Sequence, residues 1–303
     1  MKQLTYICFF LICLNSRGQT TIIPDVNFEL ALIDLGLDNG VPNGYISTSA
    51  IDTVTELFIP HKNINDLTGI QAFTSLVKLQ CLNNPLGEID LSNNGNLEFV
   101  NCTSNNLFNL NLNQLQNLTT LYCGNNELTN LDVSHNLNLV GLYCHGNNLS
   151  SIDVSNNVNL SLLWCYGNQL MYLDLSHNPN LADLNCSNNQ LVCININNGN
   201  NQLLYNDPEL FITVISVFNN PNLTCVQVDD PVAFSAYVLY VDPSIINADC
   251  GAMCTASLNE KMYQEKVLIG VYNLLGQITE ESSNEMLIYK YSDGTTQKIY
   301  RVR

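Results

Sequence analysis

Hydrophobic positions recur along the middle of the chain at a fixed step of 21 residues. Each unit opens with a leucine, carries a second apolar residue three positions later and a cysteine two positions after that. This spacing ends in strict alternation, which predicts a short strand with one face buried. The cysteines that mark the step are Cys81, Cys102, Cys123, Cys144, Cys165 and Cys186. A period between about 20 and 50 residues indicates an array of stacked units.

Two columns of asparagine accompany the cysteines. The first lies three residues after each cysteine and consists of Asn84, Asn105, Asn126, Asn147, Asn168 and Asn189. The second consists of Asn96, Asn117, Asn138, Asn159 and Asn180. Asparagine side chains bond readily to nearby backbone groups. We interpret both columns as structural, with the first bonded to the adjoining coil and the second capping the other bend.

The unit resembles the leucine-rich repeat, over a stretch from Val54 to about Asn201. The first unit has a 22-residue step and is similar to the internalin type, through Val54, Leu57, Ile59, Ile64, Leu67, Gly69, Ile70 and Phe73. The resemblance implies a solenoid of 21–22-residue repeats whose parallel β-sheet lines the concave face.

End pieces are expected on both sides of the repeats at 54–201. In the N-terminal cap at 20–53, apolar residues at Phe28, Ala31, Leu32 and Leu35 predict a short helix. Asp25 is its expected N-cap and Gly36 its expected stop. Such a helix covers the apolar end of the first coil. In the C-terminal cap at 202–254 we pair Cys225 with Cys250, while Cys193 and Cys254 stay unassigned.

The two extremities indicate export. Met1–Gln19 has the pattern of a secretory signal peptide, with Lys2 before an apolar run. The tail at 255–303 predicts strands at Lys266–Tyr272, Met286–Tyr291 and Gln297–Val302. Its motifs Val-Tyr-Asn-Leu-Leu-Gly-Gln at 271–277 and Ile-Tyr-Lys-Tyr-Ser-Asp-Gly-Thr at 288–295 resemble the C-terminal sorting domain of type IX secretion. The alternative is a small β module that packs on the solenoid.

Motifs at Ile23–Phe28 and Leu67–Ile70 resemble secreted repeat proteins of the Bacteroidetes type. Together with the tail, this resemblance implies a protein that is secreted, extracellular or on the outer cell surface, exported by the type IX machinery. We expect a monomer with no membrane insertion in the mature chain.

The formal net charge of the 303-residue chain is −17, and Lys78 is the only lysine or arginine between Asn63 and Glu260. Such a surface argues against nucleic acid as a partner, since phosphate contacts need basic residues. The column cysteines stand where the family usually has an inward leucine, and in-register parallel strands give poor disulfide geometry. We expect free thiols in the interior, with no metal and no cofactor.

A candidate binding site follows from the residues that flank the inward positions of the strands. They face outward on the concave side and include Phe99, Tyr122, Tyr143, His145, Leu162, Trp164 and Tyr166. Aromatic residues dominate binding hot spots and suit stacking on sugar rings or peptide groups. The alternative is that neighbouring tyrosines stack to stiffen the sheet.

A further column of Asp90, Asp132, Asp153 and Asp174 could hold calcium. The alternative is that each aspartate closes its own turn. Candidate catalytic residues recur with the repeat rather than standing singly, so no catalytic site is expected. The sequence therefore favours a non-enzymatic protein that binds a protein or glycan through the concave face. The alternatives are a passive surface or matrix component and, last, a polysaccharide hydrolase.

Overall fold

The computed structural model describes residues 18–200, 215–235, 243–251, 268–272, 286–291 and 296–300. The expected signal peptide lies outside this set up to residue 17, as does Cys254. The chain divides into two compact units, Met1–Thr255 and Ala256–Arg303. None of the described helices has the length and apolarity that a membrane crossing requires.

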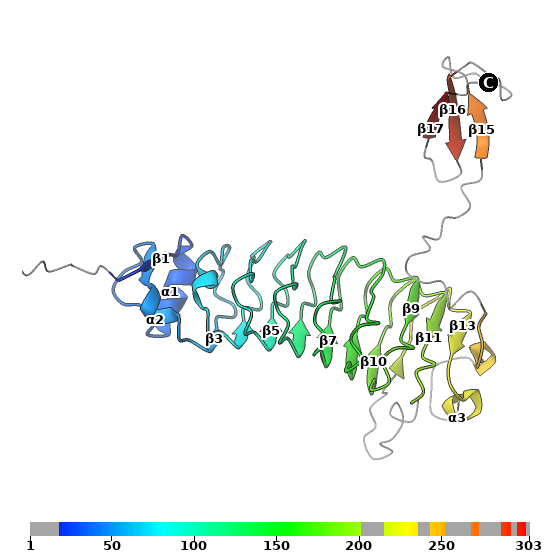
Figure 1. Ribbon diagram of the computed structural model, residues 1–303, viewed down its shortest axis with the longest axis horizontal. Coiled ribbons are helices and arrows are strands. Elements are labelled where there is room, and N and C mark those ends of the chain that lie inside the picture. The colour runs from blue at the N-terminus through cyan, green and yellow to red at the C-terminus, as the bar shows by residue number, and fades with distance from the viewer. Residues whose placement is uncertain are drawn as a thin grey trace, which may run out of the picture. The chain divides into compact units, whose positions relative to one another are not determined.

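Stacked coils build the first unit, and each coil adds one strand to a parallel sheet (Figure 1). This first sheet has eight strands in the order β12-β10-β8-β7-β6-β5-β4-β3. Their bounds are β3 Glu56–Phe58, β4 Lys78–Gln80, β5 Phe99–Asn101, β6 Thr120–Tyr122, β7 Gly141–Tyr143, β8 Leu162–Trp164, β10 Asp183–Asn185 and β12 Ile215–Ser216. Equivalent repeat positions pair, such as Leu121 with Leu142 and Leu142 with Leu163. The predicted leucine-rich repeat solenoid is confirmed.

One side of each coil is buried in a continuous core. The middle strand residues Leu79, Val100, Leu121, Leu142, Leu163 and Leu184 are fully buried, and so are the six column cysteines. All six are free thiols, as predicted. Stacking is what buries these groups, since a single coil has no second wall.

The first asparagine column bonds to backbone as predicted. Asn147 is typical: its Oδ1 accepts from the N–H of Leu128, and its Nδ2 donates to the carbonyls of Cys123 and Cys144. Asn105 is the exception, because its Nδ2 donates only to Thr103 O. The coil that it faces carries Pro85, and there Gly87 N bonds to the Asn105 carbonyl instead.

The second asparagine column caps the other bend as expected, with each Nδ2 donating to a carbonyl 22 residues earlier. A third column was not predicted. It comprises the fully buried Asn94, Asn136, Asn157 and Asn178. Each donates through Nδ2 to two carbonyls of the preceding coil. Asparagine thus joins neighbouring coils at three places around the turn, except in the coil that carries Asn105 and Leu115.

The N-terminal cap consists of β1 Thr20–Ile22, α1 Val26–Asp34, β2 Tyr45–Ser47 and α2 Thr48–Ile51, with β1 and β2 antiparallel. Asp25 is the N-cap of α1, as predicted, and its Oδ1 accepts from Asn27 N and Phe28 N. Its Oδ2 accepts from Asn65 N and Asp66 N of the first coil. One carboxylate therefore starts the helix and also attaches it to the solenoid, while the buried Phe28 packs 6.4 Å from Phe73 between ring centroids.

A turn and a short helix complete this end. The buried carboxylate of Glu29 accepts from the N–H groups of Asn43 and Gly44. Gly36 follows the end of α1 with a φ of 72°, as expected of a helix stop. The 3₁₀ helix η1 Ile70–Ala72 begins after Gly69 and supplies buried Ile70 to the same core.

A second parallel sheet lines the last coils, and the sequence analysis did not predict it. Its order is β14-β13-β11-β9, with β9 Tyr172–Asp174, β11 Cys193–Asn195, β13 Cys225–Gln227 and β14 Ile246–Asn247. The expected C-terminal cap thus contributes strands to both sheets, β12 to the first and β13 and β14 to the second. It also contains α3 Pro231–Ser235 and η3 Pro243–Ile245.

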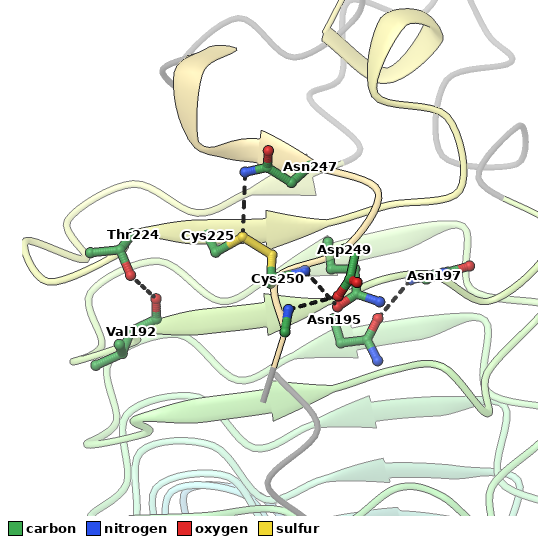
Figure 2. Close-up of a disulfide and its surroundings, with 10 residues drawn as sticks. Val192, Asn195, Asn197, Thr224, Cys225, Asn247, Asp249 and Cys250 are labelled. Atoms are coloured by element: carbon green, nitrogen blue, oxygen red, sulfur yellow. Dashed lines mark hydrogen bonds between the residues drawn. A yellow bond between two sulfur atoms is a disulfide. The ribbon is translucent and has the colours of Figure 1, made fainter. Parts of the chain in front are cut away.

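The disulfide Cys225–Cys250 closes this end, as predicted, with a Cα separation of 6.0 Å. Figure 2 shows it between β13 and the segment after β14, with Asn247 Nδ2 donating to Cys225 Sγ at 3.5 Å. Cys193 is also disulfide-bonded. These three sulfurs lie within 4.8 Å of one another, but their disulfide bonds leave no thiolate to hold a metal.

The second unit contains an antiparallel three-stranded sheet in the order β15-β16-β17. The strands are β15 Leu268–Tyr272, β16 Met286–Tyr291 and β17 Thr296–Tyr300. They correspond to the three strand-like runs predicted from the sequence.

Candidate functional site

Strands β5 to β8 place the candidate residues on the outer face of the first sheet. Phe99 and Leu162 occupy the first position of their strands, while Tyr122, Tyr143 and Trp164 occupy the third. The pairing puts Tyr122 beside Tyr143 and Tyr143 beside Trp164. We call Phe99, Tyr122, Tyr143 and Trp164 the aromatic row. His145 and Tyr166 follow two residues after the last strand positions and lie beside it.

The rings of the row stand against one another. Tyr122 and Tyr143 are stacked with centroids 4.1 Å apart and an interplanar angle of 5°. The ring centroids of Phe99 and Tyr122 are 5.6 Å apart. Lys78 Nζ lies over the Phe99 ring, 5.3 Å from its centroid. All members are only partly exposed. The tyrosines therefore turn their faces to each other, which is the geometry that stiffening of the sheet predicts, and leave ring edges toward solvent.

His145 and Tyr166 form a second stack beside the row. Their centroids are 4.6 Å apart, with an interplanar angle of 10°. Gly124 makes room for it, because a Cβ there would lie 2.5 Å from His145 Cε1. Burial lowers the pKa of His145 below its ordinary value. The imidazole is therefore neutral at pH 7.

Trp164 departs from the stacking pattern. Its plane makes an angle of 78° with Tyr143 at a centroid distance of 5.2 Å, and 54° with Tyr166 at 6.5 Å. Neither tyrosine covers the indole face to face. Its Nε1–H donates to Asp183 Oδ2 at 3.1 Å.

Asp183 is the residue that the sequence analysis missed. It occupies the same strand position as Phe99 and Leu162, one strand beyond Leu162, so continuing that column by one step would have found it. The side chain is half-buried. Burial raises its pKa above the ordinary aspartate value, while the hydrogen bond from Trp164 partly offsets the shift.

The pKa of the Tyr143 hydroxyl is also shifted by its surroundings. Burial is the main cause that raises the pKa of its hydroxyl, followed by its hydrogen bond with Tyr122 and by the charges of Tyr122 and Asp183. Tyr143 is therefore neutral at physiological pH. The row thus presents a neutral hydroxyl at Tyr143 and a carboxylate, Asp183, at its Trp164 end.

The protonation of Asp183 can be followed by tryptophan fluorescence, because Trp164 donates to this carboxylate and is the only tryptophan in the chain. We expect its fluorescence to change on acidification, with a midpoint above about 3.9, the ordinary aspartate pKa. Since the pKa is higher in the folded state, Asp183 favours folding most at low pH, and this contribution falls as pH rises through the folded pKa.

The matched control is Asp183→Asn, which keeps the shape and removes the titrating group. The transition should vanish in this variant. A transition that persisted unchanged would assign it to His145 instead, because burial lowers the pKa of that imidazole below its ordinary value.

The other chemically notable columns serve the fold. Each aspartate of the column Asp90, Asp132, Asp153 and Asp174 accepts from the N–H of the serine two residues on. This is the turn-closing alternative to calcium binding. Burial raises the pKa of the column thiols, to about 12 for Cys102, Cys144 and Cys186. Thiolates are therefore scarce in the core.

No family model matches the sequence, and no curated protein matches it. Among solved structures, internalin C2 of Listeria monocytogenes is 20% identical with a TM-score of 0.51, over 69% of this chain and 97% of that chain. The functional domain of InlJ from the same organism, which includes a cysteine ladder, is 23% identical over 70% and 68%, with a TM-score of 0.37. These identities establish similarity of fold alone.

A leucine-rich repeat protein of Leptospira interrogans is 21% identical with a TM-score of 0.48. The match covers 60% of this chain and only 52% of the Leptospira chain. The chain therefore spans about half the length of that protein.

Proposed function

We propose that this leucine-rich repeat protein is a non-enzymatic scaffold that binds a protein partner through the outer face of its first sheet. The observation that carries the proposal is the aromatic row. Most other repeated side chains, including the thiols, the asparagines and the aspartates, have structural partners. The row and its neighbours lie on the face of the sheet, together with the exposed Phe58 of β3. Exposed and partly exposed aromatic residues are typical of binding hot spots.

Ring orientation favours a polypeptide over a glycan. Sugar rings are bound by stacking on open aromatic faces, but Tyr122 and Tyr143 cover each other at 4.1 Å. Ring edges with hydroxyl groups suit the amide groups and side chains of a polypeptide, as in paratopes rich in tyrosine. A glycan is the second candidate, because the indole of Trp164 is not covered face to face.

Export is part of the same proposal. The charged and apolar pattern of Met1–Gln19 supports a signal peptide. The motifs of the tail at 255–303, which contains the three-stranded sheet, support a type IX sorting domain of the Bacteroidetes type. The cap at 20–53, repeats at 54–201 and cap at 202–254 then form the extracellular or surface-exposed body, which we expect to act as a monomer.

The test is a double variant, Tyr143→Ala with Trp164→Ala, in the full chain. Peptide and glycan arrays probed with the unaltered protein identify a ligand, and its affinity for the variant is then measured. One hot-spot residue contributes about 2 kcal/mol or more, and such contributions do not simply add, so we expect the double variant to bind at least about 30-fold more weakly. Circular dichroism should show an unchanged fold.

Phe108→Ala is the matched control. Phe108 is 59% exposed and lies outside both sheets, so its loss removes a similar ring from another surface. Affinity should stay within about twofold in this variant. If the double variant bound as well as the control, the site would be wrong. Absence of any array ligand would favour a passive matrix component.

A further inference from the structure

Among the described residues, no basic side chain forms an ion pair with the carboxylate of Asp183. In the part of the chain that the structure describes, this carboxylate accepts one hydrogen bond, from Trp164 Nε1–H to Oδ2 at 3.1 Å. The ion pair found among the described residues joins Lys62 to Asp34 near the N-terminal end of the solenoid, and so does not involve Asp183. Half-burying a carboxylate costs free energy unless a charge or further hydrogen bonds compensate for it.

The neighbouring ring adds a second attraction for a cation. Trp164 is turned out of the tyrosine stack, at 78° to Tyr143. The next residue in its column is Asn185, whose Oδ1 accepts from the backbone and hydroxyl of Ser187. The aromatic row therefore ends at Trp164 with an indole beside a carboxylate. Indole is the strongest cation–π partner among the side chains.

The distribution of charge over the rest of the solenoid also favours a cationic ligand. Lys78 is the only lysine or arginine between Asn63 and Glu260, and it lies at the other end of the row, over Phe99. No lysine or arginine between Asn63 and Glu260 can therefore reach Asp183. An acidic body also attracts cationic partners over longer distances.

From this geometry we propose that the Asp183 end of the aromatic row binds an arginine or lysine side chain of an extended polypeptide. The carboxylate serves as its counter-ion and the indole of Trp164 as the surface against which it packs. The inference rests on the proposed function and specifies the chemistry of the ligand at one position.

Trp164 fluorescence in the full chain tests this at low ionic strength, where charge attraction is strongest. The probes are an acetylated Gly-Arg repeat peptide, a Gly-citrulline peptide of the same length, and chitohexaose. Citrulline keeps the shape of arginine and lacks its charge. We expect the arginine peptide to bind at least about 10-fold more tightly than the citrulline peptide.

Two variants assign the effect. Asp183→Asn should reduce the preference for arginine to within about twofold. Glu127→Gln removes the same charge from an exposed loop and should leave the preference intact. Equal binding of the two peptides, or an unchanged preference in Asp183→Asn, would overturn the inference.

The outcomes also separate this inference from the proposed function. A response to chitohexaose that exceeds the response to the arginine peptide would overturn the inference and assign the row to glycans. If the arginine peptide failed while the Tyr143 and Trp164 double variant still lost its array ligand, the cation site would be wrong and the binding face would stand. If the double variant also kept its ligand, both would fail.

Discussion

Asn147→Ala is expected to lower the free energy of unfolding by about 3 kcal/mol, because buried backbone groups lose their hydrogen bonds. Its Oδ1 is the partner of Leu128 N–H, and its Nδ2 donates to Cys123 O and Cys144 O, both at 3.0 Å. The two carbonyls retain Asn126 and Asn168 as second donors. The amide of Leu128 is left without its partner and dominates the loss.

Asn148→Ala is the control for this prediction. Asn148 is exposed, and its side chain only accepts from Gln169 Nε2 at 3.5 Å, so the change should stay within about 0.5 kcal/mol. Urea unfolding followed by circular dichroism measures both variants. Equal effects at the two neighbouring positions would contradict a structural role for the first asparagine column.

Gly69→Ala is expected to cost about 4 kcal/mol, from backbone strain and overpacking together. Gly69 has a φ of 106°, which L side chains rarely adopt. An added Cβ would also lie 2.7 Å from Ile22 O and would collide with Ile23 Cδ1. The substitution should therefore push the N-terminal cap off the first coil.

Gly87→Ala separates the two causes. Its φ is 70°, but a Cβ there meets nothing within 4 Å, so only strain remains, at about 1–2 kcal/mol. Hydrogen exchange over residues 20–53 should rise in Gly69→Ala and stay unchanged in Gly87→Ala. Equal protection of the cap in both variants would show that β1 does not need the close approach to Gly69.

The parts of the fold that follow a strict period were predictable. The thiols at the step of 21 residues are buried because every coil places the same position inward, and the first two asparagine columns follow from the same register. Asp25 was predictable as an N-cap, but its second role was not, since Oδ2 reaches Asn65 N some 40 residues away. Contacts between coils of different type leave no periodic signal.

Interruptions of the period hid the remaining features. The third asparagine column has Leu115 where the pattern requires an asparagine, and this breaks the series. The second sheet appears only in the last coils, where β11 pairs with β9 on one side and with β13 on the other. Its strands have no counterpart in the coils from β3 to β7.

The candidate site was predictable as a set of positions and not as a surface. Register placed Tyr122, Tyr143 and Trp164 next to one another, as β6 to β8 show. Side-chain torsions decide whether a ring offers its face or its edge, and spacing carries no information on torsions. The role of Asp183 depends on one such torsion, which brings the indole N–H of Trp164 within 3.1 Å.

The solenoid account depends most on the inward placement of the column thiols, and alkylation measures it directly. The folded protein is treated with iodoacetamide, and each cysteine is read by peptide mass. Burial and a raised pKa should leave Cys102, Cys123, Cys144 and Cys165 unlabelled until guanidinium unfolds the chain. Labelling of these four thiols in the folded protein at the rate of the unfolded chain would contradict the stacked coils, and with them the binding face.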